Sequence, residues 1–599
     1  MSLLKIEKNR VTIDGEPFRL LSGDIHYFRV YPGGMKRRLQ YMKAFGLTTL
    51  QTYCPWHLHE PEKGEFCFDG IADLKGFLSL ADEMGFKVML RPAPYICSEC
   101  DCGGLPYWLL KENNIALRTR DEVYLKHVAE YYDRLCKEFV PFLSTNGGPI
   151  IAVAVENEYG SYGSDKVYLE ALAKMLVDRG VDVPLYTTDG TLLRMLGNGS
   201  IDGIWEGVNY RYESYEAIPI SRKFQPDKVP YVGEYWSGRA GYWGENFKRR
   251  EIPEVVQGFK EALEMGATFN FYMFNGGTNF GFTNGSHRLV AYYAPEGTPI
   301  KFMSILTSYD TDALLNEQGE PTKKYFACRK ALYKYLGEPE PPMPDTGYEV
   351  QTIEPINLTK ACSLWDYAEK APVTHSIKPL SFEQLNQAYG FVLYRTTVMS
   401  YGEKMTLTLP ELRDRADVYI NGKLYGTMMR ERDDCTKIDI DLPKGEFKLE
   451  ILVENLGRIF YGPLIHQHKG LIGGAVIDSA MLLTEWDCIS LPFKNLDDVD
   501  YDDIKTYKGP QLLKGEFKAK PGADAFLDMR NFKKGFVFVN GFNLGRYWNI
   551  GPQYTLYVPG DLLKENNTVE VFELYCAPKS KQIKTSPKHI IAKEAKAQS

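Results

Sequence analysis

The chain has 599 residues, more than one hydrophobic core usually holds, so two to four domains are expected. Its 71 basic and 78 acidic residues give a net charge of −7 at pH 7, a balance that excludes the strongly basic surface of a nucleic-acid-binding protein. The sequence contains no run of about eighteen apolar residues, so we expect no membrane-spanning helix and no membrane partner.

The N-terminus and the cysteines bear on the cellular compartment. The opening stretch, MSLLKIEKNRVTIDGEPFRLL, lacks the apolar core of a signal peptide. The 11 cysteines are odd in number and scattered, which favours reduced thiols, so we expect a cytoplasmic protein. Cys97, Cys100 and Cys102 lie close together, but a structural zinc site usually has four ligands. We therefore expect free thiols lining a cleft, with a zinc site as the minor alternative, and no cofactor.

The first 335 residues alternate apolar strand patterns with amphipathic helical patterns. In the helical segments 33–46, 71–85, 121–143, 165–180 and 252–266, apolar residues recur every three or four positions. Eight such units in about 330 residues predict a (β/α)8 barrel. A doubly wound open sheet is the alternative, but the Gly-rich phosphate turn typical of it does not follow the first strand. The expected strands are 18–27, 47–56, 86–95, 149–158, 183–190, 202–210, 229–236 and 267–277.

Polar side chains stand at the ends of nearly all eight expected strands. Barrel active sites form at the carboxyl ends of the strands, so this repetition indicates a site more strongly than any single polar strand end would. The residues concerned are Asp24, His26, Tyr53, Trp56, His57, Tyr95, Glu99, Asn157, Glu158, Asp189, Glu206, Asn209, Glu234, Tyr272 and Asn275.

A Pro- and Glu-rich stretch after the barrel reads as a linker, and the pattern then changes to short alternating strands. Two stretches there, 416–428 and 535–548, resemble each other, each with an Asn-Gly turn typical of a β-hairpin. We expect two related β-sandwich domains that support the barrel, or alternatively bind sugar themselves. The Lys-rich stretch 579–599 is expected to be solvated. The predicted units are the barrel 1–335, a linker 336–350, a joining segment 351–385, β-sandwiches 386–490 and 491–590, and a tail 591–599.

Glu158 and Glu234 end the fourth and seventh strands, so a closed barrel would place them across its mouth from each other. Two such carboxylates are what glycoside hydrolysis needs, one protonated and one ionised. Asn157 would then hydrogen-bond a sugar 2-hydroxyl and Tyr272 would hold the ionised carboxylate. By strand alternation Glu156 shares a side with Glu158, and we interpret it as a supporting or ion-paired residue. Salt-bridged structural glutamates are the main alternative. A metal hydrolase is a third possibility, but the sequence contains no His pairing such as H-E-x-x-H that would bind the metal.

The stretch NGGPIIAVAVENEYGSYG (146–163) resembles the acid/base signature of glycoside hydrolase family 35, the β-galactosidases. Further segments resemble the family in the same order, so the resemblance covers nearly the whole chain. They include GEPFRLLSGDIHYFRV (15–30), RPAPYICSECDCGGLPYWLL (91–110), YVGEYWSGRAGYWG (231–244), FYMFNGGTNFGF (271–282) and FVFVNGFNLGRYWNIGPQYTLYVP (536–559).

The resemblance implies a (β/α)8 barrel followed by two β-sandwich (jelly-roll, galactose-binding-like) domains, and a retaining mechanism without metal. Glu158 would be the acid/base and Glu234 the nucleophile, with carboxyl groups about 5–5.5 Å apart. The implied activity is that of an exo-β-galactosidase, releasing terminal nonreducing β-D-galactosyl residues from small oligosaccharides through a covalent intermediate. A homodimer is left open. The implied substrate-binding residues are Tyr53, Ser98, Glu99, Asn157, Tyr272, Trp236, Trp243 and Thr311. The two tryptophans would stack on the leaving group, or alternatively pack within the barrel.

Four positions depart from the family pattern. His57 stands where Asn is usual, Ala93 where Gly is, Cys100 where Trp is, and Thr311 where Tyr is. We expect all four near the mouth of the pocket, where they bear on the sugar accepted. These departures motivate one alternative, the same mechanism on another β-glycone such as a glucosaminide, fucoside or arabinoside. A non-catalytic carbohydrate-binding protein on the same fold is a separate alternative.

Overall fold

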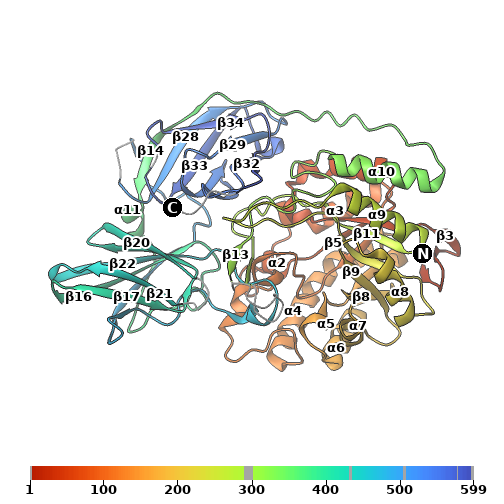
Figure 1. The fold of residues 1–599 in the computed structure, drawn as a ribbon, viewed down its shortest axis with the longest axis horizontal. Coiled ribbons are helices and arrows are strands. Elements are labelled where there is room, and N and C mark those ends of the chain that lie inside the picture. The colour runs from red at the N-terminus through yellow and green to blue at the C-terminus, as the bar shows by residue number, and fades with distance from the viewer. Residues whose placement is uncertain (1–2, 289–300, 431–434, 504–507, 577, 595–599) are drawn as a thin grey trace.

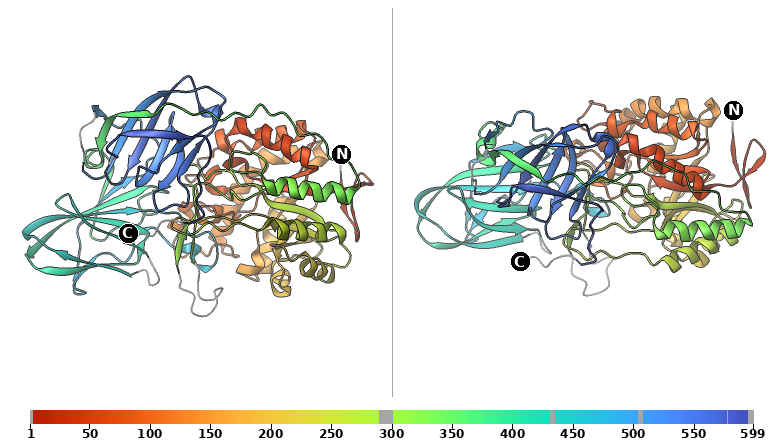
Figure 2. Two further views of the ribbon diagram at one scale, coloured as in Figure 1. Left: turned by 45° about the horizontal axis from the view of Figure 1, so that its top comes forward. Right: turned by 90° about the horizontal axis from the view of Figure 1, so that it is seen from above.

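The computed structural model describes residues 3–288, 301–430, 435–503, 508–576 and 578–594. An α/β barrel fills one end of the molecule and two β domains lie side by side at the other (Figure 1). The additional views show that both β domains lie on the same side of the barrel (Figure 2).

Eight parallel strands close into one barrel, with the spatial order β10-β11-β4-β5-β6-β7-β8-β9. Every strand lies within one of the eight ranges predicted from the apolar pattern, so the barrel prediction is confirmed and the open doubly wound sheet is excluded. The strands are β4 (Leu21–Ile25), β5 (Thr49–Tyr53), β6 (Lys87–Arg91), β7 (Ile150–Ala154), β8 (Leu185–Gly190), β9 (Trp205–Tyr210), β10 (Tyr231–Trp236) and β11 (Thr268–Asn275).

Helices follow the barrel strands, and several begin at residues that cap the first turn. The Asp73, Asp121 and Asp165 side chains accept backbone N–H bonds at three helix starts, as good N-caps do. The sequence pattern missed α7, α8 and α10; α8 contains Pro219, which interrupts a helical pattern. The helices are α1 (Met35–Phe45), α2 (Trp56–His59), α3 (Leu74–Glu83), α4 (Glu122–Phe139), α5 (Tyr159–Tyr162), α6 (Lys166–Val177), α7 (Leu193–Gly199), α8 (Ser214–Phe224), α9 (Ile252–Glu264) and α10 (Lys323–Leu336).

Two small antiparallel sheets accompany the barrel. A three-stranded sheet precedes its first strand, and a two-stranded one lies in the loop after β11. Their strands are β1 (Leu4–Ile6), β2 (Val11–Ile13), β3 (Glu16–Phe18), β12 (Ser286–Arg288) and β13 (Phe302–Ser304).

After α10 the chain runs without regular structure along the barrel to the far β domain (Figure 1). There β14 (Ile356–Ser363), followed by α11 (Leu364–Ala368), pairs with β28 and β34, so this stretch contributes a central strand to the C-terminal sheet. The other strands of that sheet are β27 (Asp502–Asp503), β28 (Gln511–Lys518), β29 (Ala525–Asp528), β30 (Lys534–Val539), β31 (Phe542–Trp548), β32 (Thr555–Val558), β33 (Asn566–Glu573) and β34 (Gln582–Ser586).

Between β14 and the rest of that domain, the chain builds a sandwich of a six-stranded and a four-stranded sheet. One apolar cluster, including Val392, Leu407, Ile440 and Trp486, joins the two sheets. The six-stranded sheet contains β15 (Val373–Ser376), β16 (Phe391–Tyr401), β19 (Arg415–Ile420), β20 (Lys423–Met429), β22 (Lys444–Glu454) and β26 (Trp486–Leu491). The four-stranded sheet contains β17 (Lys404–Pro410), β21 (Cys435–Asp441), β24 (Val476–Ile477) and β25 (Met481–Leu482), and β18 (Leu412–Arg413) pairs with β23 (Gly470–Leu471) in a separate two-stranded sheet.

The two predicted Asn-Gly turns form matching hairpins in the two β domains. Asn421-Gly422 joins β19 to β20, Asn540-Gly541 joins β30 to β31, and all four residues have positive φ, as a tight hairpin turn requires. Each hairpin also shifts register two residue pairs before its turn, between Val418 and Tyr419 and between Val537 and Phe538. The predicted internal repeat therefore corresponds to one shared piece of backbone geometry.

The Lys-rich C-terminal stretch is not the solvated tail that its composition predicts. Residues 582–586 form β34, which pairs with β14 and β29, and His589 stacks on Phe526 with a ring-centroid distance of 5.7 Å. Apolar residues such as Ile583 anchor the stretch although lysines surround them. Residues 595–599 of the predicted tail lie outside the described residues.

No helix in the described part of the chain is long and apolar enough to cross a membrane. The ten cysteines whose side chains the structure describes are all free thiols. Within the same residues, no three His, Cys, Asp or Glu side chains gather as metal ligands would.

Candidate active site

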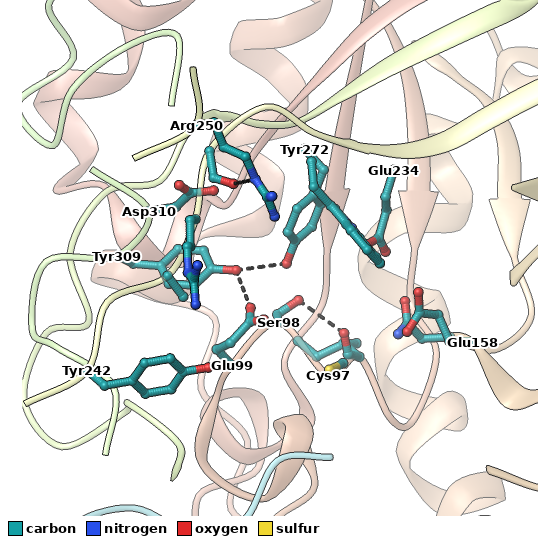
Figure 3. Close-up of a pocket in the computed structure, with 16 residues that line it drawn as sticks. Cys97, Ser98, Glu99, Glu158, Glu234, Tyr242, Arg250, Tyr272, Tyr309 and Asp310 are labelled. Atoms are coloured by element: carbon teal, nitrogen blue, oxygen red, sulfur yellow. Dashed lines mark hydrogen bonds between the residues drawn. The ribbon is translucent and has the colours of Figure 1, made fainter. Parts of the chain in front are cut away.

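A pocket opens at the carboxyl ends of the barrel strands, and both predicted catalytic carboxylates line it. Glu158 and Glu234 face each other there, together with five of the predicted substrate-binding positions (Figure 3). The lining residues are Ile96, Cys97, Ser98, Glu99, Asn157, Glu158, Glu234, Trp236, Gly238, Arg239, Ala240, Tyr242, Arg250, Tyr272, Tyr309 and Asp310.

Glu234 lies in β10 at an irregularity in the barrel. The register of β10 shifts against both β9 and β11 between Val232 and the next paired residues, and such bulges re-aim a side chain. Its carboxylate accepts two hydrogen bonds, from the Tyr53 hydroxyl at 2.7 Å and from Trp236 Nε1 at 3.0 Å. Arg91 Nη1 lies 3.5 Å from Oε1. Glu234 therefore has two hydrogen-bond donors and a neighbouring positive charge.

Glu158 lies beyond the end of its strand, because β7 stops at Ala154. Its backbone has the left-handed φ of 48°, between the strand and the short helix α5. Its carboxylate accepts one hydrogen bond, from Asn209 Nδ2 at 2.9 Å, and the described residues supply no cation that pairs with it. Desolvation and the charge of Glu234 raise the pKa of Glu158 to about 7.

The two carboxylates are therefore prepared for different states at neutral pH. Glu234 has two donors and a guanidinium, whereas Glu158 has one neutral amide and a negative neighbour. A carboxylic acid beside an ionised carboxylate can protonate a leaving oxygen while its partner attacks carbon. The pocket can thus support acid-assisted displacement at a sugar.

Glu156 does not share a side with Glu158, contrary to the alternation argument. It forms a bidentate pair with Arg118, with Nε to Oε1 at 2.8 Å and Nη2 to Oε2 at 2.9 Å, and both side chains are about 1% exposed. The alternation fails because residues 155–158 are not in the strand. The interpretation of Glu156 as an ion-paired residue is confirmed.

Arg91, at the carboxyl end of β6, connects the two halves of the site. Its Nη2 donates to Asn157 Oδ1 at 2.6 Å and to Thr188 Oγ1 at 2.8 Å, while Nη1 approaches Glu234. Asn157 lines the pocket with its amide fixed in this way. Sequence reasoning missed Arg91, although its place at a strand end was the available signal.

Tyr53, and not Tyr272, holds the carboxylate of Glu234. The Tyr272 hydroxyl instead bonds to the Tyr309 hydroxyl at 2.9 Å, and Tyr309 donates to Glu99 (Figure 3). Both tyrosines line the pocket, so Tyr272 lies in the site but acts at its other end. The sequence analysis missed Tyr309, which lies in a loop after the last barrel strand.

The loop that carries Ser98 and Glu99 has unusual backbone geometry. Cys97, Ser98 and Glu99 have φ values of 56°, 47° and 50°, a conformation that non-glycine residues rarely adopt. Arg29 supports the loop with a hydrogen bond from its Nη2 to the Ser98 carbonyl at 2.5 Å. Of the three clustered cysteines, only Cys97 lines the pocket; Cys100 and Cys102 are buried.

The remaining predicted positions divide between the pocket and its surroundings. Trp236 lines the pocket, whereas Trp243 packs with Phe247, Leu306 and Ile550 in a separate apolar cluster. Thr311 does not line the pocket, although its neighbours Tyr309 and Asp310 do. The four departures from the family pattern are buried and do not themselves line the pocket, so their bearing on the sugar that is accepted stays a prediction: His57, Ala93, Cys100 and Thr311.

Comparison with known proteins agrees with this architecture. The model of "Glycosyl hydrolases family 35" matches residues 10–335. The models of "Beta-galactosidase, first all-beta domain" and "Beta-galactosidase, galactose-binding domain" match residues 379–492 and 510–568. A solved family 5 structure from Streptomyces cattleya in complex with GlcNAc aligns at 11% identity and a TM-score of 0.38, over 55% of this chain and 83% of that one. That likeness is too low to add to the assignment.

Three curated relatives match nearly end to end. Beta-galactosidase of Xanthomonas manihotis is 39% identical over 91% of this chain and 89% of its own length. Beta-galactosidase of Bos taurus is 37% identical over 95% and 90%, and Beta-galactosidase-1-like protein 2 of Homo sapiens is 38% identical over 96% and 90%. With a matching family model over more than half its length and relatives above 30% identity over nearly all of it, this chain belongs to glycosyl hydrolase family 35.

Proposed function

We infer that the protein is a retaining exo-β-galactosidase that releases terminal nonreducing β-D-galactosyl residues, with Glu234 as nucleophile and Glu158 as acid/base. The activity follows from family membership and from the relatives named Beta-galactosidase. The two residue roles are our proposal. The observation that carries them is the unequal environment of the two carboxylates: Glu234 accepts two hydrogen bonds and lies beside the Arg91 guanidinium, whereas Glu158 accepts one hydrogen bond from an amide.

The proposed reaction has two steps. Glu234 attacks the anomeric carbon while Glu158 gives its proton to the departing oxygen, which forms a galactosyl-enzyme ester and a free alcohol. Glu158, now ionised, takes a proton from water as that water attacks the same carbon, so galactose leaves with its configuration retained. Asn157 and the Glu99–Tyr309 pair line the pocket at places where they can hold sugar hydroxyls.

Azide rescue of two alanine variants tests the roles separately. In Glu234→Ala, azide fills the space of the lost nucleophile, so we expect α-galactosyl azide from an activated aryl β-galactoside. In Glu158→Ala, azide attacks the galactosyl-enzyme from the other face, so we expect β-galactosyl azide. NMR of the products distinguishes the two anomers, and exchanged outcomes would exchange the roles.

The substrate is a carbohydrate, which the galactose-binding domain match supports. A cytoplasmic location and a homodimer stay predictions. Fractionation of the native host and sedimentation of the purified chain, respectively, test them.

A further inference from the structure

An aspartate inside the barrel has no part in the proposed reaction and does not line the pocket. Asp24 is on β4, which lies between β5 and β11 in the closed sheet, and its side chain is fully buried. Its Oδ2 accepts two hydrogen bonds, from Gln51 Nε2 of β5 at 3.0 Å and from Asn270 Nδ2 of β11 at 2.7 Å. Its Oδ1 has no hydrogen-bond partner in the part of the chain that the structure describes. Asp24 thus connects an amide on each neighbouring strand.

The same two amides also hold the backbone beside the nucleophile. A side-chain amide nitrogen carries two hydrogens. Gln51 Nε2 donates its second hydrogen to the Gly233 carbonyl at 3.1 Å, and Asn270 Nδ2 donates to the same carbonyl at 2.8 Å. Gln51 Oε1 accepts from the Tyr231 hydroxyl at 2.6 Å. Asn270 Oδ1 accepts from the Ser22 hydroxyl at 2.8 Å. These hydroxyls fix the orientation of each amide, so both nitrogens face the acid and the carbonyl.

Gly233 is the residue that forms the bulge in β10. The pairing of β10 with β9 passes from Val232 directly to Glu234 and skips Gly233. Such a bulge turns the side chain that follows it. A Cβ atom on Gly233 would lie 2.4 Å from Thr188 Cγ2, so a larger residue does not fit there. The orientation of the nucleophile therefore depends on how the backbone at Gly233 is held.

Asp24 is a neutral acid at pH 7 in this environment. Burial, opposed by the Asn270 hydrogen bond and the charge of Arg91, raises the pKa of Asp24 to about 8. Among the described residues no cation forms an ion pair with Asp24, and the Arg91 guanidinium contacts Glu234 instead, at 3.5 Å. The neutral acid therefore leaves this positive charge to the nucleophile. Asparagine reproduces the neutral acid both in shape and in its acceptor oxygen.

We propose that Asp24 is a positioning residue for the nucleophile Glu234. It holds two amides in the orientation that fixes the bulge at Gly233, and the bulge aims the carboxylate at the anomeric carbon. Gln51 and Tyr53 lie two residues apart on β5 and point to the same face. The strand β5 thus holds the carboxylate through Tyr53 and the backbone that carries it through Gln51. This inference rests on the proposed function, because it concerns how the nucleophile of that reaction is placed.

A mechanism-based inactivator measures attack by the nucleophile alone. In 2,4-dinitrophenyl 2-deoxy-2-fluoro-β-galactoside the leaving group needs no proton and the fluorine slows release of the galactosyl-enzyme. We expect Asp24→Leu, which is similar in shape but accepts no hydrogen bond, to lower the rate constant of inactivation by about ten- to a hundredfold, the cost of a misplaced reacting group. The dissociation constant of the inactivator should change by less than about twofold, because no residue of this network lines the pocket.

The conservative variant Asp24→Asn separates orientation of the amides from other effects. It keeps an oxygen that accepts from both Gln51 and Asn270, so we expect an inactivation rate constant within about threefold of the wild type. Two results overturn the proposal: Asp24→Asn as slow as Asp24→Leu, or Asp24→Leu as fast as the wild type. The burst of dinitrophenolate counts the active sites in each sample, so a partly unfolded variant does not imitate a slow one.

A buried acid in another domain is the matched control. Glu573, in the C-terminal β domain, is buried, accepts backbone N–H bonds from Lys533 and Tyr575, and has its pKa raised to about 7 by burial. Glu573→Met should lower the stability of the chain but leave the inactivation rate constant unchanged. Equal falls for Glu573→Met and Asp24→Leu would assign the effect to lost stability and overturn the proposal.

A double-mutant cycle tests the route through the amide. Asn270→Leu removes one of the two groups by which Asp24 acts on Gly233. The falls in the inactivation rate constant should therefore overlap, and the double variant with Asp24→Leu should lose less than the product of the two single losses. A loss equal to that product overturns the route.

Two measurements on the wild type separate this inference from the function on which it rests. If 4-nitrophenyl β-galactoside is not hydrolysed, the proposed function fails and this inference fails with it. If the substrate is hydrolysed, mass spectrometry of the inactivated protein locates the bound sugar. A label on a residue other than Glu234 overturns both the nucleophile assignment and this inference. With the label on Glu234, the Asp24 variants alone decide the inference.

Discussion

Buried carboxylates have different electrostatic partners in two regions of this protein, the interface between the barrel and the first β domain and the pocket of the barrel. Where the barrel joins the first β domain, each acid is paired with a cation: Arg458 contacts Asp101 at 2.9 Å and Glu383 at 2.6 Å. Asp414 there contacts Lys469 and Arg430, and these charges outweigh burial and lower its pKa. In the pocket, Glu158 has no such partner among the residues that the structure describes, and its pKa rises to about 7.

The difference shows where charge stabilises the fold and where it performs chemistry. A paired carboxylate stays ionised and fixes two segments relative to each other. An unpaired one beside a second carboxylate keeps its proton at neutral pH, at a cost in stability, and can donate it. Glu156 and Glu158 show the same difference although they are only two residues apart. Glu156 forms an ion pair with Arg118, whereas Glu158 accepts one hydrogen bond from an amide.

The largest expected effect comes from breaking the interface. Arg458→Met leaves Asp101 and Glu383 without their cation, and we expect a loss of about 3–5 kcal/mol in the free energy of unfolding. Urea denaturation measures it. Asp101 begins a turn two residues after the pocket residue Glu99, so the loss of its ion pair should also displace Glu99. We therefore expect a higher KM for an aryl β-galactoside in the Arg458→Met protein that remains folded. The exposed Arg530→Met, which breaks a surface pair, is the control and should cost less than about 1 kcal/mol.

The Glu156 and Glu158 substitutions should change stability in opposite directions. Glu156→Gln leaves Arg118 buried without a charge partner and should cost about 3 kcal/mol. Glu158→Gln should stabilise the protein at pH 8 by about 1–3 kcal/mol, because it removes a carboxylate whose ionised form the fold disfavours.

The pH dependence of that gain follows from the raised pKa. The ordinary pKa of Glu158 is 4.5, so between pH 4.5 and about 7 the folded state holds a proton that the unfolded state has lost. Stability of the native protein therefore falls as pH rises through this window, and the advantage of Glu158→Gln appears across the same window. Thermal unfolding at pH 4 and pH 8 measures it; an equal difference at both pH values contradicts the account.

The smallest expected effect concerns the donors to Glu234. Tyr53→Phe removes a 2.7 Å hydrogen bond to the nucleophile and should lower kcat about tenfold with little change in stability. Tyr272→Phe is the matched comparison, because its hydroxyl bonds to Tyr309 and not to Glu234. An equal fall in kcat for the two variants, with an unchanged KM for both, would contradict the assignment of Tyr53.

Much of the barrel was predictable because its signals are local. Apolar runs and helical periodicity placed all eight strands, and the rule that sites form at strand ends identified Glu158, Glu234 and Asn209. The side of Glu156 was predicted wrongly because β7 ends four residues before Glu158, whose positive φ redirects the chain. Periodicity gives no warning of such a turn.

Contacts between distant segments were not predictable from one sequence. Arg458 and Asp101 are 357 residues apart, and no local pattern pairs them. The hydroxyl of Tyr53, 181 residues from Glu234, fills the role expected of Tyr272 for the same reason. Trp243 has an aromatic side chain of the kind that stacks on sugars, but it packs in an apolar cluster of residues from distant parts of the chain.

The central claim is that Glu158 holds its proton up to about pH 7 because, among the described residues, it pairs with no cation and it faces the charge of Glu234. Carbon-13 NMR titration of side-chain-labelled glutamate, assigned with Glu158→Gln, measures this pKa in the wild type and in Glu234→Gln. We predict a pKa of about 7 in the wild type and a lower value in Glu234→Gln, where the negative neighbour is gone. A wild-type value near 4.5, or one that Glu234→Gln leaves unchanged, would contradict the account.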